Sequence, residues 1–526
     1  MSARLGWLAG FTVAWFLAFP HPVAGTVLDL GFALGWIAPA LLLRGLDGLP
    51  PRRAARAAFL AGWAAYALVF HWIYVAVVDY GHASPLIGVG ASIGLALYPA
   101  AFFAVFGAGW SALGRARLAS PFAAAALWVA LEHARTFVAT GFPWALLGYT
   151  QHANAALVAT APIAGVWGPA FTVALASAAL ATHRASPRGA RAAFAAVAAV
   201  LAAGTLAVLR PANEPAATVR VGVLQGNVDQ DVKWSPDFAE KTLGDYEALT
   251  RRAAEQGAQV VVWPETAVPG SPDWDTEVAE RLSKLAADTH TALVVGAVGI
   301  ERIRPRDDAT VTARIFDSAF LYGPDGARLD RYDKTHLVPF GEYTPFGELL
   351  GRFVHAIARG AAATDVTPGD AVRTLAIPLA SGGTLSAGVP ICYELLFPDG
   401  VRRFVAGASD RQDAELLLAI TNDAWYGRTG APYQFLVMTA LRSAENRVWT
   451  ARAANTGVSA LIDDRGRVRM QTNLFEQTFL VGDVPRRPAP LGGSFYARHG
   501  DWLPEGCWAA LAGLAVVAWR RRGATA

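Results

Sequence analysis

Long stretches without any charged side chain mark the first 210 residues. The longest runs free of Asp, Glu, Lys and Arg are residues 5–28, 57–78, 80–114, 136–183 and 192–209. A helix needs about 20 mostly apolar residues to cross the hydrocarbon core of a bilayer. Weaker candidates, with a charge in or beside them, lie at about 27–43, 120–138 and 503–519. The pattern predicts a polytopic α-helical membrane domain of about eight transmembrane helices, seven before residue 211 and one at the C-terminus.

The charged residues are concentrated in the rest of the chain. Residues 1–210 hold 16 of the 87 charged side chains, about 8% of that segment, whereas the remainder is about 22% charged, near the norm for soluble proteins. This contrast excludes a single soluble globule, and the 54% hydrophobic content excludes a disordered or collagen-like chain. We therefore expect a transmembrane domain over 1–210, a globular domain over 211–502, and a membrane helix with an Arg-rich tail over 503–526.

Arginine placement predicts the orientation in the membrane. Cytoplasmic loops retain Lys and Arg, and here arginines cluster in alternate connections between the predicted spans. These are Arg4, Arg44, Arg52, Arg53, Arg56, Arg115, Arg117, Arg184, Arg188, Arg191, Arg520, Arg521 and Arg522. Both termini are thus predicted to be cytoplasmic, with 211–502 on the opposite side. Because several more apolar spans follow at once, the first one is interpreted as an uncleaved helix rather than a secretory signal.

Overall charge and cysteine usage narrow the classes of partner. With 45 basic and 42 acidic residues the chain has no cationic excess, so we expect no nucleic-acid partner. The two cysteines, Cys392 and Cys507, form no disulfide framework and no Cys/His spacing resembles a zinc site. We expect neither a metal nor a cofactor. Cys507, inside the last apolar run, is interpreted as a buried apolar residue.

After residue 218 the pattern changes to short apolar runs that alternate with amphipathic stretches. The predicted strands are 219–228, 259–263, 292–299, 315–322, 384–391 and 414–421, and the predicted helices are 236–256, 276–289 and 434–450. This alternation predicts a layered α/β domain whose helices cover its sheets. Loops at strand ends are where such folds place their chemistry.

Two of these strand ends carry a charged residue among apolar neighbours. Glu265 follows an apolar strand and Pro264, and its surroundings favour a raised pKa suited to a general base. Lys334 is one of only four lysines and can stabilise an oxyanion, with Glu342 eight positions further on. Taken singly, Glu265 is more typical of a surface residue, and Lys334 of a solvated lysine paired with Asp333.

A third strand end carries Cys392. A thiol at a strand-to-helix turn lies near helix N–H groups, which lower a thiol pKa and can form part of an oxyanion hole. A lone cysteine is usually a small buried apolar residue. Glu265, Lys334 and Cys392 at three strand ends are much more specific than any one alone, because together they supply a base, a cation and a thiol nucleophile.

At these residues the chain resembles the nitrilase superfamily, whose Glu-Lys-Cys triad lies on an αββα sandwich, and in particular its membrane branch, the apolipoprotein N-acyltransferases. The resemblance covers nearly the whole chain. It rests on Leu224-Gln225-Gly226-Asn227, Trp263-Pro264-Glu265-Thr266, Val338-Pro339-Phe340-Gly341-Glu342-Tyr343, Ile391-Cys392-Tyr393-Glu394, Thr421-Asn422-Asp423-Ala424-Trp425-Tyr426-Gly427, the 442–459 tract, His71-Trp72 and the 132–144 segment. The chain departs from the family at Phe435, where a His is expected, and at the Pro20-His21-Pro22 turn.

The resemblance implies a two-stage acyl transfer. The thiolate of Cys392, activated by Glu265, takes an acyl chain from a phospholipid while Lys334 stabilises the oxyanion, and the thioester passes to the α-amino group of a diacylglyceryl-cysteine in an apolipoprotein. It also implies supporting roles for Glu342, Tyr393 and Glu394, and substrate-binding roles for Trp234 and Trp425. The implied location is the bacterial inner membrane, with a periplasmic catalytic domain and a monomeric chain.

Two other functions fit parts of the sequence. A membrane-anchored amidohydrolase that cuts a small amide uses the same triad but does not need seven preceding spans. A transporter with a relict triad is disfavoured because the membrane part shows no repeat. Glu132 and Arg135, in the fifth predicted span, suit either a pair at a helix end or a functional role.

Overall fold

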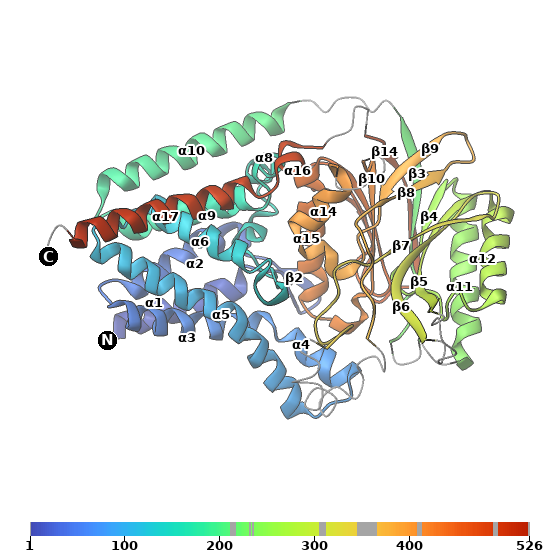
Figure 1. The fold of residues 1–526 in the computed structure, drawn as a ribbon, viewed down its shortest axis with the longest axis horizontal. Coiled ribbons are helices and arrows are strands. Elements are labelled where there is room, and N and C mark those ends of the chain that lie inside the picture. Colours follow the sequence, from blue (N-terminus) through green and yellow to red (C-terminus); the bar gives the residue numbers. More distant parts are fainter. Residues whose placement is uncertain are drawn as a thin grey trace.

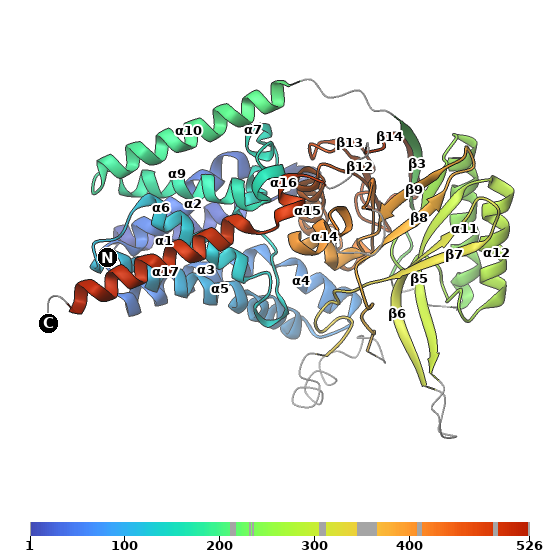
Figure 2. The ribbon, with the colours of Figure 1, turned by 45° about the horizontal axis from the view of Figure 1, so that its top comes forward.

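In the computed structural model the chain is described over residues 2–210, 217–230, 233, 236–303, 312–344, 365–407, 413–487 and 493–523. A helical part and a two-sheet sandwich stand side by side along the long axis of the molecule (Figure 1). The N- and C-terminal ends lie together at the end of the helical part that is remote from the sandwich (Figures 1 and 2). Trp234 lies outside the described residues.

Each of the eight predicted spans overlaps one helix of 14 residues or more, but several bounds differ from the prediction. The helices are α1 (Ser2–Leu17), α2 (Gly31–Leu46), α3 (Pro51–Val69), α5 (Pro85–Arg115), α6 (Pro121–Ala134), α9 (Trp167–Thr182), α10 (Pro187–Leu209) and α17 (Trp502–Gly523). Four of them begin with proline, whose missing N–H costs nothing in the first turn of a helix.

Length and composition support fewer membrane spans than eight. Among the described residues, three helices, α5, α10 and α17, are long and apolar enough to cross a bilayer. A fourth span results if α3 and the short helices after it, α4 (Trp72–Tyr74) and the π-helix η1 (Val75–Tyr80), count as one segment with a 53° bend. Helices α1, α2, α6 and α9 have 14 to 16 residues. The count of eight therefore stays a prediction.

Short elements connect the long helices on the side that faces the sandwich. They are the hairpin β1 (His21–Val23) and β2 (Thr26–Leu28), the 3-10 turns η2 (Val138–Thr140) and η3 (Leu147–Gln151), and the short helices α7 (Ala155–Val158) and α8 (Ala161–Ala164). The uncharged run 136–183 thus contains one long helix, α9, and a folded segment before it. Gly141 turns the chain in that segment with a φ of 86°, a conformation that favours glycine.

Two six-stranded sheets form the sandwich. One has the order β14-β3-β4-β5-β6-β7 and the other β13-β12-β11-β10-β9-β8. The strands of the first are β3 (Thr218–Gln225), β4 (Val260–Val262), β5 (Ala292–Ile303), β6 (Thr312–Tyr322), β7 (Arg328–Asp333) and β14 (Thr478–Pro485). Those of the second are β8 (Thr374–Pro378), β9 (Thr384–Gly388), β10 (Leu416–Thr421), β11 (Trp449–Ala454), β12 (Ala460–Ile462) and β13 (Val468–Gln471).

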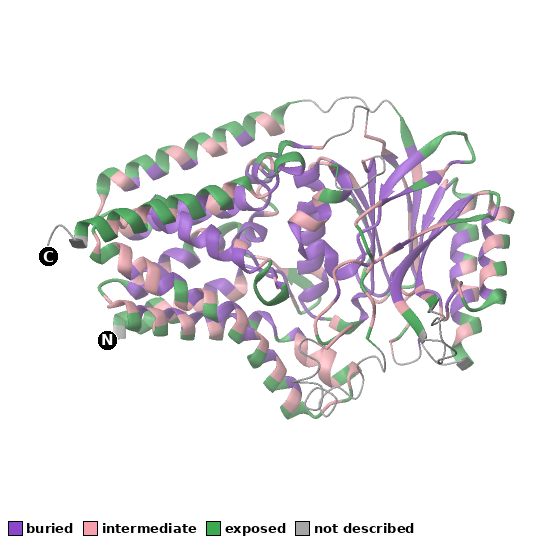
Figure 3. Cartoon of the chain, in the orientation of Figure 1, coloured by how far each residue is buried: buried purple, intermediate pink, exposed green. Residues whose placement is uncertain are grey.

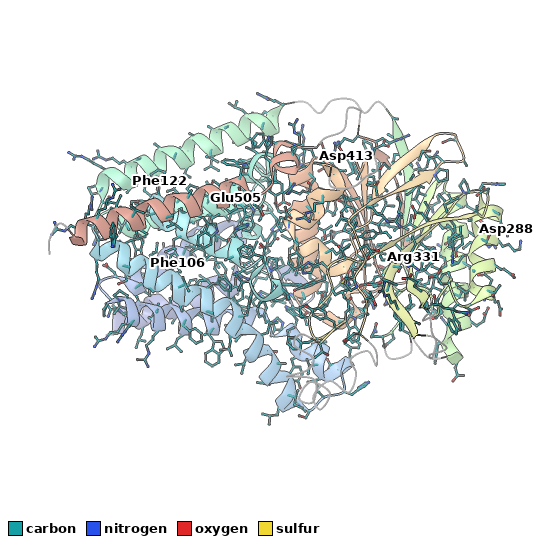
Figure 4. All side chains as sticks on the ribbon, in the orientation of Figure 1. Phe106, Phe122, Asp288, Arg331, Asp413 and Glu505 are labelled. Atoms are coloured by element: carbon teal, nitrogen blue, oxygen red, sulfur yellow. The ribbon has the colours of Figure 1, made fainter. Side chains whose placement is uncertain are left out.

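Helices cover both outer faces of the sandwich, which gives the αββα layering. Helices α11 (Pro236–Glu255) and α12 (Thr276–Thr289) lie on the face remote from the helical part, where Asp288 is labelled in Figure 4. Helices α14 (Pro398–Val405) and α15 (Ala431–Asn446) lie between the second sheet and the helical part, and α16 (Phe495–His499) precedes α17. Figure 3 shows buried residues through both sheets, whereas α10 and α17 are largely exposed. The layered α/β prediction is confirmed.

One predicted helix ends earlier than expected. The sequence pattern extends it to residue 450, but α15 ends at Asn446 and Trp449 already belongs to β11. Arg447 causes the break, because it adopts a left-handed φ of 54° and its N–H donates to the carbonyl of Ala444. Strands β7, β8 and β11 to β14 were not predicted from the sequence pattern.

Candidate active site

Three strand ends bring the predicted residues into one buried cluster. Glu265 follows β4, the all-valine strand buried between β3 and β5, and Trp263 extends that pairing by donating its N–H to the carbonyl of Val294 at 2.9 Å. Lys334 follows directly after β7, and Cys392 lies four residues beyond β9. Arg331, labelled in Figure 4, lies on β7 three residues before Lys334.

The ammonium group of Lys334 is the centre of this cluster. Its Nζ lies 3.1 Å from Oε1 of Glu265, 3.2 Å from Oδ2 of Asp317 and 2.5 Å from Oε1 of Glu342. The side chain is fully buried. Burial on its own lowers the pKa of Lys334, but the three carboxyl groups outweigh it and hold this pKa well above the ordinary value. Lys334 is therefore a permanent cation, and Asp333 is not its partner.

Glu265 is held ionised at the same point. Its Oε2 accepts the backbone N–H of Asn422 at 2.7 Å. Burial raises the pKa of Glu265, but Lys334, a hydrogen bond from Asp317 and the charge of Lys233 outweigh that effect, so the pKa lies below its ordinary value. The expectation of a raised pKa for Glu265 was wrong, because it considered apolar neighbours and not the two cations.

Asp317 is a further carboxyl group of the cluster, and its pKa is raised. Burial raises its pKa well above the ordinary value, the nearby Glu265 adds to the shift, and Lys334 opposes it. Its Oδ2 accepts from Lys334, whereas its Oδ1 accepts no hydrogen bond from the part of the chain that is described. A protonated Oδ1 that donates to Glu265 satisfies both observations. Asp317 was not predicted as a site residue, although an acidic residue within the apolar run 315–322 is a visible signal.

The three carboxylates also have the spacing of a metal site, since one oxygen from each of Glu265, Asp317 and Glu342 lies within 4.8 Å of the others. One oxygen of each of these three groups accepts a hydrogen bond from the Lys334 ammonium. The cation that balances this site is thus a side chain of the protein, and the donor set does not fit a divalent metal while Lys334 is charged.

Cys392 lies at the turn between β9 and the 3-10 helix η4 (Cys392–Leu396), with a positive φ of 46°. Such strain in a non-glycine residue persists only where the surroundings impose it, which is typical of functional sites. As the first residue of η4, Cys392 and its neighbour Tyr393 have N–H groups without an intrahelical acceptor. These donors are in position to bind an oxyanion that forms beside the thiol.

The thiol is protonated at rest. Burial and the charge of Glu265 raise the pKa of Cys392 well above its ordinary value, against opposing effects from Lys334 and a hydrogen bond with Thr421. The expectation of a lowered thiol pKa was therefore wrong, since burial and the charge of Glu265 exceed the opposing effects of Lys334 and Thr421. A neutral thiol beside an ionised carboxylate is the ground state that general-base activation requires.

Glu394 joins the lysine loop to the cysteine turn. Its Oε1 accepts hydrogen bonds from the hydroxyl of Tyr332 at 2.8 Å and from both the N–H and the hydroxyl of Thr335 at 2.7 Å. Its Oε2 accepts the N–H of Ile391 at 2.8 Å. Glu394 thus fixes the residues on either side of Lys334 relative to those beside Cys392. Glu342 has a similar structural role: one oxygen binds Lys334, and the other accepts the N–H of Val338 at 2.8 Å.

The helical part reaches the cysteine turn through Tyr393. The hydroxyl of Tyr393 donates to the carbonyl of Gly141 at 2.9 Å, and the ring stacks with that of Phe142. Two buried polar side chains at the end of α6 also bind this segment. Arg135, just after the helix, donates to the carbonyl of Trp144 at 2.6 Å, and Glu132 accepts the N–H of Leu147 at 2.7 Å. Both side chains therefore serve to position the 141–147 segment.

Trp425, for which the resemblance implies substrate binding, and two further aromatic side chains lie near the cluster. Trp425 is 37% exposed in the turn η5 (Asp423–Tyr426), with its ring 6.1 Å from that of Tyr80. His336 packs against Phe397 with ring centroids 3.8 Å apart, and burial lowers its pKa to about 4. Phe435 is fully buried under the guanidinium of Arg452. Its departure from the family pattern therefore changes packing behind the site.

A second buried lysine was also missed. Lys233 donates from Nζ to the hydroxyl of Thr266 at 2.5 Å and to the carbonyl of Glu265 at 3.4 Å. Burial lowers its pKa to about 8, against the attraction of Glu265, Asp317 and Cys392. The signal in the sequence was the scarcity of lysine, of which there are only four. Two of those four lie at this site.

Comparison with known sequences identifies both parts of the chain. Residues 220–488 match the carbon-nitrogen hydrolase family, and residues 5–179 match the apolipoprotein N-acyltransferase N-terminal domain. An amidase from Nesterenkonia sp. with a solved structure is 22% identical, covers 51% of this chain and 90% of its own, and superposes with a TM-score of 0.36.

Curated relatives match over nearly the full length. The apolipoprotein N-acyltransferase of Geobacter metallireducens is 37% identical over 519 residues, which is 95% of each chain. That of Azotobacter vinelandii is 36% identical over 95% of this chain and 93% of its own, and that of Pseudomonas putida is 34% identical over 88% and 89%. With both domain families matched in order and relatives of this identity end to end, the chain belongs to the apolipoprotein N-acyltransferase family.

Proposed function

We propose that this protein transfers an acyl chain from a phospholipid to the N-terminal α-amino group of a diacylglyceryl-cysteine in an apolipoprotein, by way of a thioester on Cys392. The proposal rests on the position of the Cys392 thiol between the charged cluster and the helical part. Cys392 adjoins the Lys334 and Glu265 cluster on one side, and through Tyr393 it contacts the segment of the helical part at Gly141. A nucleophile at that junction is within reach of lipid esters whose chains remain in the bilayer.

In the first stage Glu265 takes the thiol proton and the thiolate attacks the ester carbonyl of the phospholipid. Lys334, with the N–H groups at the start of η4, stabilises the oxyanion of the tetrahedral intermediate. When the intermediate collapses, the carbon–oxygen bond breaks, Glu265 returns the proton to the departing lysophospholipid, and the thioester remains on Cys392. Glu342 and Glu394 are positioning residues, because they act through Lys334 and through the turn at Cys392.

In the second stage the amine of the apolipoprotein attacks the thioester. Glu265 accepts a proton from the attacking nitrogen and the carbon–sulfur bond breaks. Glu265 then passes that proton to the departing thiolate, which restores the resting thiol and the carboxylate. Because one product leaves before the second substrate reacts, ping-pong kinetics are expected. We assign a substrate contact to Trp425, which is partly exposed. The family resemblance implies the same role for Trp234.

The membrane arrangement is part of the proposal. We propose about eight spans over 1–210 and 503–526, cytoplasmic termini, and a catalytic domain over 211–502 in the periplasm of a bacterial inner membrane. Two hydrogen bonds support the proposal that both chain ends lie on the same side of the membrane. Arg4 donates to the carbonyl of Asp47, and Arg521 donates to that of Ala116. These contacts lie at the arginine-rich helix ends, as expected for cytoplasmic loops. We propose that the monomer suffices for activity.

The test uses the full chain in detergent with a labelled phospholipid and intact-mass detection of the acyl adduct. We expect an adduct on the wild type, none on Cys392→Ala, and slow formation on Glu265→Ala. Cys507→Ala is the matched control, because it removes the other cysteine and should leave the adduct unchanged. Adding a diacylated peptide should then discharge the adduct into a triacylated product.

Two outcomes would contradict the proposal. Acyl transfer without any covalent adduct would exclude the thioester. Hydrolysis of small amides in the absence of phospholipid-dependent transfer would favour an amidohydrolase instead.

A further inference from the structure

A cavity of about 430 Å³ lies apart from Cys392, where the helical part meets the sandwich. Its walls come from residues 152–162, from the end of α10 at Ala207 and Val208, from one face of α15, and from the hairpin between β12 and β13. None of the residues of the Lys334 cluster lines it. The volume is in the range of ligand sites.

The wall combines an apolar face with cations. Leu436, Val437 and Ala440 of α15 supply buried apolar surface. Three arginines of the wall, Arg447, Arg465 and Arg467, stand beside it, and no Asp or Glu is among the described lining residues. Asp464 interacts with Arg447 and Arg465 from outside the wall. Asp463 also acts on Arg447 and forms an ion pair with Arg469. Two aspartates thus stand against Arg447, Arg465, Arg467 and Arg469, so the charge beside the cavity is net positive.

The arginines differ in the hydrogen bonds that they make within the protein. Arg465 donates to the carbonyls of Val208 and Arg210 and so ties the hairpin to the end of α10. Arg447 is half-buried at the left-handed end of α15, and its guanidinium makes no hydrogen bond or ion pair with any residue in the described part of the chain. Burial of a charge without a close partner is costly unless a ligand supplies one.

The position of α10 identifies the source of such a ligand. This helix is one of the three long enough to cross a bilayer, and its surface is largely exposed (Figure 3). In its last turn Leu206 and Leu209 are 64% and 72% exposed, while Ala207 and Val208 between them face the cavity. The cavity therefore adjoins the lipid-facing side of a predicted span at the level where that span ends.

We propose that this cavity binds an anionic glycerophospholipid of the adjoining leaflet. Arg447, Arg465 and Arg467 contact its phosphate, for which the guanidinium fork is well suited. An acyl chain lies against the apolar face of α15. A zwitterionic lipid fits less well, because its ammonium group finds no carboxylate in the wall. The bound lipid joins α10 to α15 and so stabilises the contact between the two parts of the protein.

The test compares phosphatidylglycerol and phosphatidylethanolamine with identical acyl chains, added to the full chain in a neutral detergent and followed by native mass spectrometry. We expect preferential retention of phosphatidylglycerol and a higher thermal midpoint in its presence. Arg447→Gln with Arg467→Gln should weaken retention by about fivefold per arginine and abolish the thermal shift. This pair spares Arg465, whose bonds hold α10.

Lysine at both positions should restore most of the binding. Arg252→Gln with Arg314→Gln, on α11 and β6 and outside the cavity wall, should leave it unchanged. Equal retention of the two lipids by the wild type would overturn the proposal, as would unchanged binding in the glutamine pair. Displacement by soluble glycerophosphate at the same concentration would show an anion site without a lipid site. A dimer that the glutamine pair abolishes would show a contact between copies instead. Acyl transfer in detergent is predicted to be the same in all variants, so the outcome is independent of the proposed catalysis.

Discussion

Asp317→Asn tests how charge is distributed around Lys334. Asp317 Oδ2 accepts from Lys334 Nζ at 3.2 Å, and Oδ1 accepts no hydrogen bond from the described residues. Burial raises the pKa of Asp317 well above its ordinary value, and this direction leads us to expect a protonated carboxyl. Asparagine then has nearly the same shape and the same charge. We expect the variant to form the acyl adduct on Cys392 at a rate close to that of the wild type.

The two possible charge states predict very different magnitudes. A carboxylate 3.2 Å from the ammonium would interact with about 332/(20 × 3.2), or roughly 5 kcal/mol, at an effective dielectric constant of about 20. Loss of that interaction corresponds to a factor of more than a thousand. A neutral carboxyl loses only the difference between two hydrogen bonds, about 1 kcal/mol or roughly fivefold. The structure therefore predicts a change of fivefold or less for Asp317→Asn.

The assay measures the rate of adduct formation from labelled phospholipid by intact mass. Asp317→Ala serves as the contrast, because it removes the acceptor of Lys334 and leaves a cavity, and it should slow the step by about tenfold or more. The thermal midpoint of each variant shows whether it is folded. A thousandfold loss in a folded Asp317→Asn protein would mean that Asp317 is ionised, and the account of the cluster would be wrong.

Three further predictions concern the same site. Glu394→Gln places an amide donor against the N–H of Ile391 or of the lysine loop, so it should cost about 1–3 kcal/mol of unfolding free energy and slow acylation. The control is Glu415→Gln, at a buried carboxylate that lies outside the site and binds Arg486; it should lower stability without slowing adduct formation. Raising the pH through about 8 should remove the charge of Lys233 and reduce the acylation rate. Lys233→Arg should abolish this decrease at alkaline pH. If the decrease survives in the arginine variant, another group causes it. Because the pKa of Glu265 lies below its ordinary value, acylation measured on the acid side should persist down to that ordinary value, and an acid limb near neutrality would contradict this.

The sequence reveals strand ends well because apolar runs and prolines mark them. Three valines followed by Trp263 and Pro264 place Glu265 at the end of a buried strand, and the structure has it there. Asp317 is harder to recognise, because it lies within β6 and its function depends on the neighbouring strand. Register across the sheet brings Asp317 to Lys334, whose N–H donates to the Asp317 carbonyl at 2.9 Å. That register is a property of the paired strands and not of either segment.

The direction of a pKa shift is a second property that the sequence predicts poorly. Burial is predictable from apolar neighbours in the sequence, and it does act on Glu265 and Cys392 as the largest single effect. The balance depends on which charges arrive from other segments. Lys233 comes from a loop 32 residues before Glu265, and Lys334 from one 69 residues after it. The sequence around Glu265 does not show whether two cations or none lie beside its carboxylate in the folded protein.

The contacts between the helical part and the sandwich argue that the two fold as one structure. Gln434 of α15 accepts from the indole N–H of Trp144 at 2.7 Å and donates to the carbonyl of Pro20 at 3.1 Å. Glu445 accepts the N–H of Val166, and Tyr393 donates to Gly141. All these groups are buried, so separating the parts would leave each without its partner, at about 1–3 kcal/mol apiece. Since Tyr393 directly follows Cys392, the position of the proposed nucleophile depends on the helical part as well as on the sheet that carries it.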